Sequence, residues 1–275
     1  MCPLETRTQL RGYNMKVVVT SDQHLGYVNA DKTAFNGFLD NLSQQDDVTH
    51  VVLLGDLVDM WRRDASGVFL ENHDTVAKIL NLKSKGVQVY CVAGNHDYHV
   101  LDLNRPSYPL QFTKEVNLTD GQVNYRLVHG YEFDPEQKVP FMAFLCRVMS
   151  DTEGALESNL WVDFNHLNNI FSKMEPSFMK ADLAKMSERL RRRPEDRLKD
   201  SLDKINLAAR KEVKPGEVLI FGHTHAPFIN KSENVVNTGS WVKDAAIHNT
   251  YVELSGGKPR LFVFGGNEIT DRIEL

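Results

Sequence analysis

An α/β layered fold is predicted by three features of this 275-residue sequence. Short runs rich in valine, isoleucine and leucine recur and end in polar residues, which is typical of strands buried on both faces. Segments with helical patterning separate the early runs, so strand and helix alternate. The C-terminal runs have no helical segments between them, which predicts a second, more antiparallel sheet.

The predicted elements follow one another in a simple order. The five core strands are predicted at 16–22, 49–56, 87–97, 124–130 and 217–225. Two early helices are predicted at about 31–45 and 68–85, and the second ends in a lysine-rich turn before Gly86. Three hairpin-connected strands are predicted within 234–241, 250–257 and 259–266.

Residues 135–213 differ from the rest of the chain because they carry almost no strand pattern. Four helices are predicted there, at 139–150, 156–174, 176–193 and 194–213. Pro176 and Pro194 stand where two of these helices would begin. The sequence therefore predicts a helical insertion between two core strands.

This insertion divides the chain into three parts. The core is expected at 15–134 and 214–275, and the insertion at 135–213. Residues 1–14 are expected to be a loose N-terminal extension, since the first strand pattern begins at Met15; Met15 as the true start is the alternative.

The overall composition is ordinary for a soluble globular protein, with 41% hydrophobic and 25% charged residues. A net charge of -5 argues against a surface dedicated to nucleic acid. The three cysteines form no CxxC pair, which favours a reducing cytoplasm over a disulfide framework. No apolar run reaches the roughly 18 residues needed to span a bilayer.

Polar side chains follow each of the five core runs. They are Asp22, His24, Asp56, Asp59, Asn95, His96, Asp97, His129, His223 and His225. Because strand ends in α/β folds gather at one edge, we expect these groups to lie together. Imidazole and carboxylate suit Zn, Fe, Mn or Co. Gly55, Gly94, Gly130 and Gly222 stand beside them, where a residue without Cβ permits close backbone approach.

The motifs "DQH", "GDLVD", "GNHD", "VHG" and "GHTH" resemble, complete and in order, the signature of the calcineurin-like metallophosphoesterase superfamily. The resemblance implies a four-layer α-β-β-α sandwich of two mixed sheets with a helical cap insertion. It also implies a dinuclear-metal-dependent enzyme that hydrolyses a phosphodiester or pyrophosphate bond, with a metal-bridging hydroxide as the nucleophile.

The same resemblance implies a role for each motif residue. One metal ion would be held by Asp22, His24 and His225, and the other by Asn95, His129 and His223. Asp56 would bridge the two ions, which are expected to be manganese, with iron or zinc as alternatives. His96 would be the general acid for the leaving oxygen. Asp97 would orient His96 or hold its charge, and Asp59 would support the site from behind.

A narrower resemblance concerns the substrate. The segment "GDLVDMW", followed by "RRD", and the helical insertion after "VHGYEFD" look most like the UDP-2,3-diacylglucosamine pyrophosphohydrolase branch. That branch cleaves a pyrophosphate bond in a lipid-linked nucleotide sugar at the membrane surface. Its bacterial enzymes typically carry Arg where this chain has His96, so diester, pyrophosphate and monoester substrates all stay open.

Further residues are candidates for contacts with the substrate. They are Arg62, Arg63, His99, Arg191, Arg192 and Arg193. The insertion is basic and rich in aromatic residues, so it would either rest on an anionic lipid surface or pack its apolar faces on the core. The first arrangement would place this cytoplasmic protein at the inner membrane face, near a nucleotide- or lipid-linked substrate.

Two alternatives to this function come from the same fold. A nuclease of the superfamily would act on DNA, although the net charge does not favour nucleic acid as a partner. A non-enzymatic scaffold would retain the fold for protein binding, but such relatives tend to lose ligands, and this chain has every one. The sequence leaves the oligomeric state open.

Overall fold

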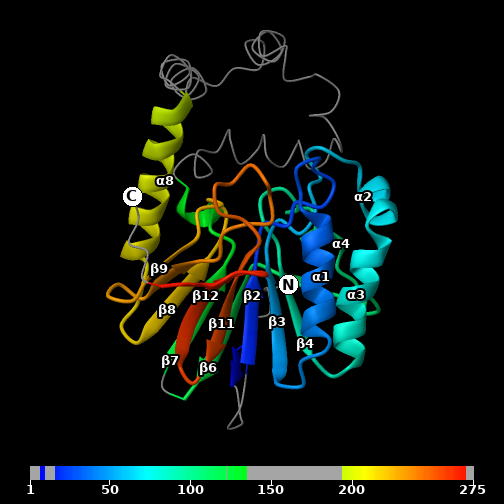
Figure 1. The fold of residues 1–275 in the computed structure, drawn as a ribbon, viewed down its shortest axis with the longest axis horizontal. Helices are drawn as coiled ribbons and strands as arrows, with labels where there is room; N and C mark the ends of the chain where they lie inside the picture. Colours follow the sequence, from blue (N-terminus) through cyan, green and yellow to red (C-terminus); the bar gives the residue numbers. More distant parts are fainter. Residues whose placement is uncertain (1–6, 10–15, 122, 135–193, 271–275) are drawn as a thin grey trace.

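Two β-sheets packed face to face form the centre of the computed structural model, which describes residues 7–9, 16–121, 123–134 and 194–270. Helices cover the outer face of each sheet (Figure 1). Among the described helices, none is long and apolar enough to cross a membrane.

The first sheet has seven strands in the order β13-β12-β11-β2-β3-β4-β5. Its strands are β2 (Lys16–Thr20), β3 (Val48–Leu54), β4 (Gln88–Val92), β5 (Phe112–Thr113), β11 (Thr250–Ser255), β12 (Lys258–Val263) and β13 (Glu268–Ile269). Strands β2 to β5 run parallel, whereas β11 pairs antiparallel with both β2 and β12. This sheet is therefore mixed.

The second sheet has six strands in the order β1-β6-β7-β8-β10-β9. Its strands are β1 (Arg7–Gln9), β6 (Glu115–Asp120), β7 (Val123–Val128), β8 (Glu217–Phe221), β9 (Phe228–Asn230) and β10 (Val235–Asn237). It is also mixed, because β7 and β8 pair in parallel while β6 and β7 pair antiparallel.

The helices form the two outer layers. They are α1 (Lys32–Leu42), α2 (Ala65–Glu71), α3 (His73–Ser84), α4 (Val100–Leu103) and α8 (Pro194–Lys211), with a 3-10 turn η1 (Tyr131–Phe133) after β7. Phe35 and Phe38 of α1 belong to the apolar cluster on the outer side of the first sheet. Ile205 and Ala209 of α8 belong to the cluster that contains Leu219 of the second sheet.

A third apolar cluster fills the space between the sheets. It contains Val19 and Val52 of the first sheet and Leu127 and Ile220 of the second, all of them at most 1% exposed. Each sheet thus buries one face against the other sheet and one face against helices, which explains why its strands read as continuous apolar runs. The predicted four-layer α-β-β-α sandwich of two mixed sheets is confirmed.

Three details differ from the sequence prediction. The segment predicted as one helix at 68–85 forms two helices, α2 and α3. Asn72 ends α2, and its side-chain Nδ2 donates to the carbonyl of Val68 at 2.7 Å. The C-terminal strands form no sheet of their own, since β10 joins the second sheet and β11 joins the first. The extension is not loose throughout, since β1 pairs with the edge of β6.

Only the last helix of the predicted insertion lies within the described residues. Its helices at 139–150, 156–174 and 176–193 lie outside the described residues, while the helix predicted at 194–213 is α8. The division into core and cap stays a prediction.

Candidate metal centre

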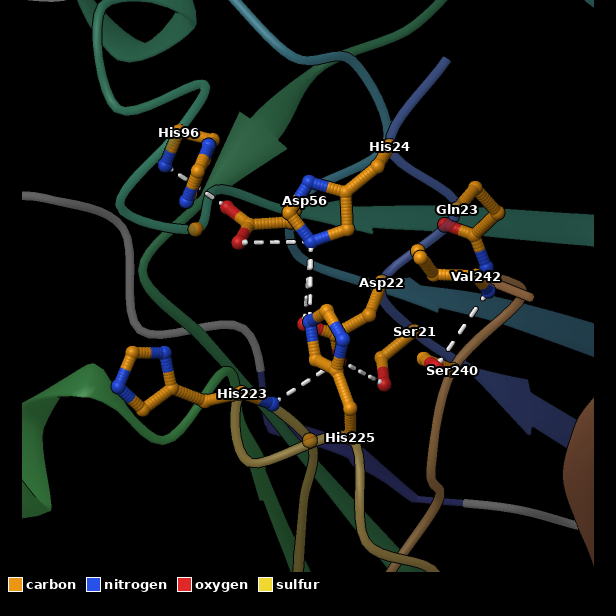
Figure 2. Close-up of polar contacts among 12 residues, drawn as sticks. Ser21, Asp22, Gln23, His24, Asp56, His96, His223, His225, Ser240 and Val242 are labelled. Carbon is orange, nitrogen blue, oxygen red and sulfur yellow. Dashed lines mark hydrogen bonds and ion pairs between the residues drawn. The ribbon is translucent and has the colours of Figure 1, made fainter. Parts of the chain in front are cut away.

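Five loops meet where the C-terminal ends of strands from the two sheets come together. Figure 2 shows Asp22, His24, Asp56, His96, His223 and His225 from four of these loops. The loops after β2, β3 and β4 come from the first sheet, and the loops after β7 and β8 come from the second. They carry the predicted ligands Asp22, His24, Asp56, Asn95, His129, His223 and His225. The prediction that the strand ends converge is correct, but they converge from two sheets.

Five of these seven residues have a left-handed backbone. The φ angles are 55° at Asp22, 47° at His24, 52° at Asp56, 64° at His223 and 55° at His225. A residue with a side chain is strained there by about 1–3 kcal/mol, and such strain concentrates at functional sites. Backbone hydrogen bonds between loops hold the strained residues, including Asp22 N to Gly55 O at 3.0 Å and His24 N to Asp56 O at 2.9 Å.

Asp22, His24 and His225 form the first ligand group. His24 Nε2 lies 3.1 Å from His225 Nε2 and 3.7 Å from Asp22 Oδ1. His225 Nε2 lies 3.2 Å from the same carboxylate oxygen. Asp56 Oδ2 approaches from the other side, 3.6 Å from His24 Nε2. These are the spacings expected of ligands around one cation.

The second ligand group contains Asp22, Asp56 and His129. His129 Nε2 lies 3.2 Å from Asp56 Oδ2 and 3.3 Å from Asn95 Oδ1. Asp56 therefore faces both groups. His223 does not join the second group: its ring is turned away from His225 (Figure 2), and its Nε2 lies 3.4 Å from Asp134 Oδ2.

The buried atom Asp22 Oδ1 indicates that a cation fits here. Within the described part of the chain it accepts no well-directed hydrogen bond. Three imidazole nitrogens nevertheless face it, from His225 at 3.2 Å, His24 at 3.7 Å and His129 at 3.9 Å. A buried carboxylate oxygen without a donor is costly, and a metal ion would satisfy it together with the imidazoles.

The electrostatics of the site point the same way. Burial opposes ionisation of Asp22, yet His129 and His225 hold the pKa of its carboxyl well below the usual range. Burial likewise opposes protonation of His129, yet Asp56 and Asp22 raise its pKa to about 10. Burial also opposes protonation of His24, yet Asp22 and Asp59 raise its pKa to about 10. The carboxylates thus attract positive charge to the positions that a metal ion would fill.

His96 forms a third candidate group with His24 and Asp56 and is held by Asp59 and Trp61. Its Nδ1 is 3.1 Å from Asp59 Oδ1, and its ring stacks on Trp61 with the centroids 4.0 Å apart. Asp59 also accepts a hydrogen bond from His24 Nδ1 at 3.2 Å. One buried carboxylate therefore orients both a predicted ligand and the predicted acid.

The structure pairs His96 with Asp59 and not with Asp97, so Asp97 does not orient this ring by a hydrogen bond. Asp97 accepts hydrogen bonds from the backbone N–H groups of Gly94 at 2.6 Å and Leu57 at 2.8 Å. It ties the loop after β4 to the loop after β3. Burial, reinforced by the charge of Asp56, raises the pKa of Asp97 to about 7.

The candidate substrate residues have different surroundings. Arg62 Nη1 donates to Asp59 Oδ2 at 2.5 Å and its guanidinium lies over the ring of Tyr27, so it borders the site. Arg63 pairs instead with Glu71. His99 directly precedes α4, and its Nδ1 lies 4.0 Å from Asp102 Oδ2. Arg191, Arg192 and Arg193 lie outside the described residues.

Two supporting residues were not predicted from the sequence. Ser21 donates to Asp22 Oδ2 at 2.5 Å, and Asp134 faces His223. Ser21 directly precedes a ligand, which was an available signal. Asp134 stands five residues after His129, and only the turn η1 brings it back to the site.

Substituting Gly94 by Ala is expected to unfold the site. A Cβ at this position would lie 2.0 Å from Asp56 Oδ1 and 2.5 Å from Asp56 N. We expect a loss of roughly 3 kcal/mol in the free energy of unfolding, measured by urea denaturation. Gly37→Ala is the control, because its Cβ would meet nothing closer than 3.7 Å and helix α1 should gain stability. Equal stability of the two variants would contradict this geometry.

The solved structures to which this chain is similar have low sequence identity to it and TM-scores below 0.5. A cold-active protein-tyrosine phosphatase of a psychrophilic Shewanella species is 16% identical, with a TM-score of 0.46 and coverage of 97% of this chain and 82% of that one. A dimetal phosphatase from Danio rerio is 10% identical, with a TM-score of 0.43 and coverage of 92% and 100%. Vacuolar protein sorting 29 from Cryptosporidium parvum is 15% identical, with a TM-score of 0.39 and coverage of 94% and 99%.

The family comparison is decisive where these likenesses are not. No curated protein matches the sequence significantly. The family model of the calcineurin-like phosphoesterases matches residues 15–227, which include every predicted ligand from Asp22 to His225. This chain therefore belongs to the calcineurin-like phosphoesterase family.

Proposed function

We propose that this protein hydrolyses a phosphodiester or pyrophosphate bond with two divalent metal ions, manganese in the first instance. Its family implies a metal-dependent phosphoester hydrolase with two such ions. One observation carries the proposal for this chain: the carboxylate of Asp56 faces both ligand groups, 3.6 Å from His24 Nε2 and 3.2 Å from His129 Nε2. Two neighbouring cations need a shared anion of this kind.

The ligands are assigned as the sequence predicts. The first ion would be held by Asp22, His24 and His225, and the second by Asn95, His129 and His223, with Asp56 between them. When bound, the ions would activate water and neutralise charge on the phosphoryl oxygens. Asn95 and His129 Nε2 already face each other at 3.3 Å.

His96 is proposed to protonate the leaving oxygen. Burial lowers the pKa of its ring, while the nearby carboxylates of Asp56 and Asp59 oppose that shift. Nδ1 of His96 is hydrogen-bonded to Asp59, so Nε2 is the ring nitrogen that would face the substrate. The stack on Trp61 holds the ring in this direction. His96 would act as the general acid from a fixed position.

Within this class of reaction, the proposed substrate is a nucleotide- or lipid-linked molecule. The "GDLVDMW" segment supports the UDP-2,3-diacylglucosamine hydrolase-like branch, and Trp61 of this segment contacts His96. His96 itself departs from that branch. Arg62 would contact a phosphate, as would Arg191, Arg192 and Arg193 of the cap. The cap would contact the inner membrane face, where a lipid-linked substrate would lie.

The test is hydrolysis of three substrates by manganese-loaded protein. They are bis-p-nitrophenyl phosphate, p-nitrophenyl phosphate and a UDP-sugar pyrophosphate. Preference for the first or third would support the proposal and decide between diester and pyrophosphate. Preference for the monoester would overturn it, and two bound ions without turnover would favour the scaffold alternative. Tight, salt-dependent DNA binding would favour a nuclease.

Each histidine of "GHTH" is expected to serve a different ion. His225→Ala should lose the first ion and His223→Ala the second, because His225 faces Asp22 while His223 lies beside His129, with ring centroids 5.3 Å apart. The measurement is the metal content of each variant after equilibrium dialysis. Either variant with two ions and full activity would show that the assignment is wrong.

A further inference from the structure

A buried carboxylate faces the one predicted ligand ring that is turned out of the cluster. Asp134 Oδ2 lies 3.4 Å from His223 Nε2, and the two side chains are only 11% and 12% exposed. A carboxylate oxygen can only accept, so a hydrogen bond in this contact requires a proton on Nε2 of His223. The other ring nitrogen, Nδ1, is then the one available to a metal ion.

In the other buried ligand rings, too, one nitrogen donates a hydrogen bond and the other faces the ligand cluster. His24 donates from Nδ1 to Asp59, and its Nε2 faces the other ligands. His129 donates from Nδ1 to the carbonyl of Leu54 at 2.9 Å, and its Nε2 faces Asp56. Metal-binding histidines generally donate their second N–H in this way, which fixes the tautomer and the ring direction. Asp134 is in the corresponding place for His223.

The turn after β7 places Asp134 beside His223. Gly130 has a φ of 120°, and a Cβ on it would lie 2.9 Å from Phe221 Cδ2 and 3.1 Å from His223 Cβ. Only glycine lets the chain pass this close to the end of β8. Phe133 then packs on Phe221, with ring centroids 5.8 Å apart, and is 4% exposed. The position of Asp134 is therefore set by packing.

We propose that Asp134 is the positioning residue of the second metal site. It accepts the Nε2 proton of His223 and presents Nδ1 to the ion, so His223 binds through the opposite nitrogen from His24 and His129. The segment 129–134 thus supplies one ligand of the second ion and supports another. The proposal rests on the proposed dinuclear centre.

The first test measures the binding of manganese to the full chain by calorimetry. Asp134→Leu keeps nearly the shape of the side chain and removes the acceptor. We expect affinity for one of the two ions to fall roughly 10- to 100-fold and affinity for the other to stay unchanged. Glu132→Gln is the matched control, because Glu132 is a carboxylate of the same turn that accepts from Gly130 N at 2.9 Å. Unchanged affinities in Asp134→Leu, or an equal loss in the control, would overturn the proposal.

The second test uses the unsubstituted protein, in case Asp134→Leu does not fold. Nitrogen NMR of the zinc-loaded chain should show the proton of His223 on Nε2 and the protons of His24 and His129 on Nδ1. A proton on Nδ1 of His223 would overturn the proposal. Neither test measures hydrolysis: two bound ions with this tautomer but no turnover would support Asp134 and contradict the proposed function. A single bound ion would contradict both.

Discussion

Replacing Asp56 with Asn should abolish most hydrolysis, with kcat/KM falling roughly 10³-fold, or about 4 kcal/mol of transition-state stabilisation. Asp56 Oδ2 faces His24 and His129, one from each ligand group, and Oδ1 accepts from His96 N at 2.8 Å. An Asn side chain is neutral and has one acceptor oxygen, so it cannot both accept from His96 N and present an anion to the two ligand groups. The measurement is hydrolysis of bis-p-nitrophenyl phosphate together with metal content, and the content should fall below two ions.

The control for this experiment is Asp47→Asn, which makes the same chemical change at an exposed position before β3. It should retain activity and both ions. Full activity in Asp56→Asn would remove the observation on which the proposed function depends. Activity loss with two ions still bound would show that Asp56 is needed for the reaction and does not hold the ions.

Replacing Asp59 with Asn should lower kcat/KM by roughly 10- to 100-fold through two separate contacts. The carboxylate accepts from His24 Nδ1 at 3.2 Å and from His96 Nδ1 at 3.1 Å, and it pairs with Arg62. An Asn side chain can accept from only one of the two rings. We therefore expect weaker binding of the first ion and a less well oriented His96.

The leaving group separates these two effects. A p-nitrophenolate leaves without a proton, whereas an alkoxide needs one from His96. Asp59→Asn should therefore lose more activity on an alkyl phosphodiester than on bis-p-nitrophenyl phosphate when metal is saturating. Asp64→Asn is the control, because Asp64 caps α2 through Gly67 N, and Asn serves equally well there. Equal losses on both substrates would show that Asp59 acts through His24 alone.

Much of the site could be predicted because its ligands directly follow apolar strands. A strand buried on both faces is readable from a short run such as 16–22, and the polar residue that ends it must lie at the edge of the sheet. The order of the motifs then indicated the family, and with it the four layers. Residues far from a strand end carry no such signal, and this is why Asp134 was missed.

The core strands, the candidate ligand residues that follow them and the family could be read from the sequence alone, because each of these depends on local order along the chain. The pairings between distant parts of the chain follow only from the folded structure. The junction of β11 with β2, the choice of Asp59 over Asp97 as the partner of His96, and the contact of Asp134 with His223 all join residues from different loops or strands. Which partners meet is set by how the two sheets stack and how tightly each loop turns, and no single stretch of residues encodes that.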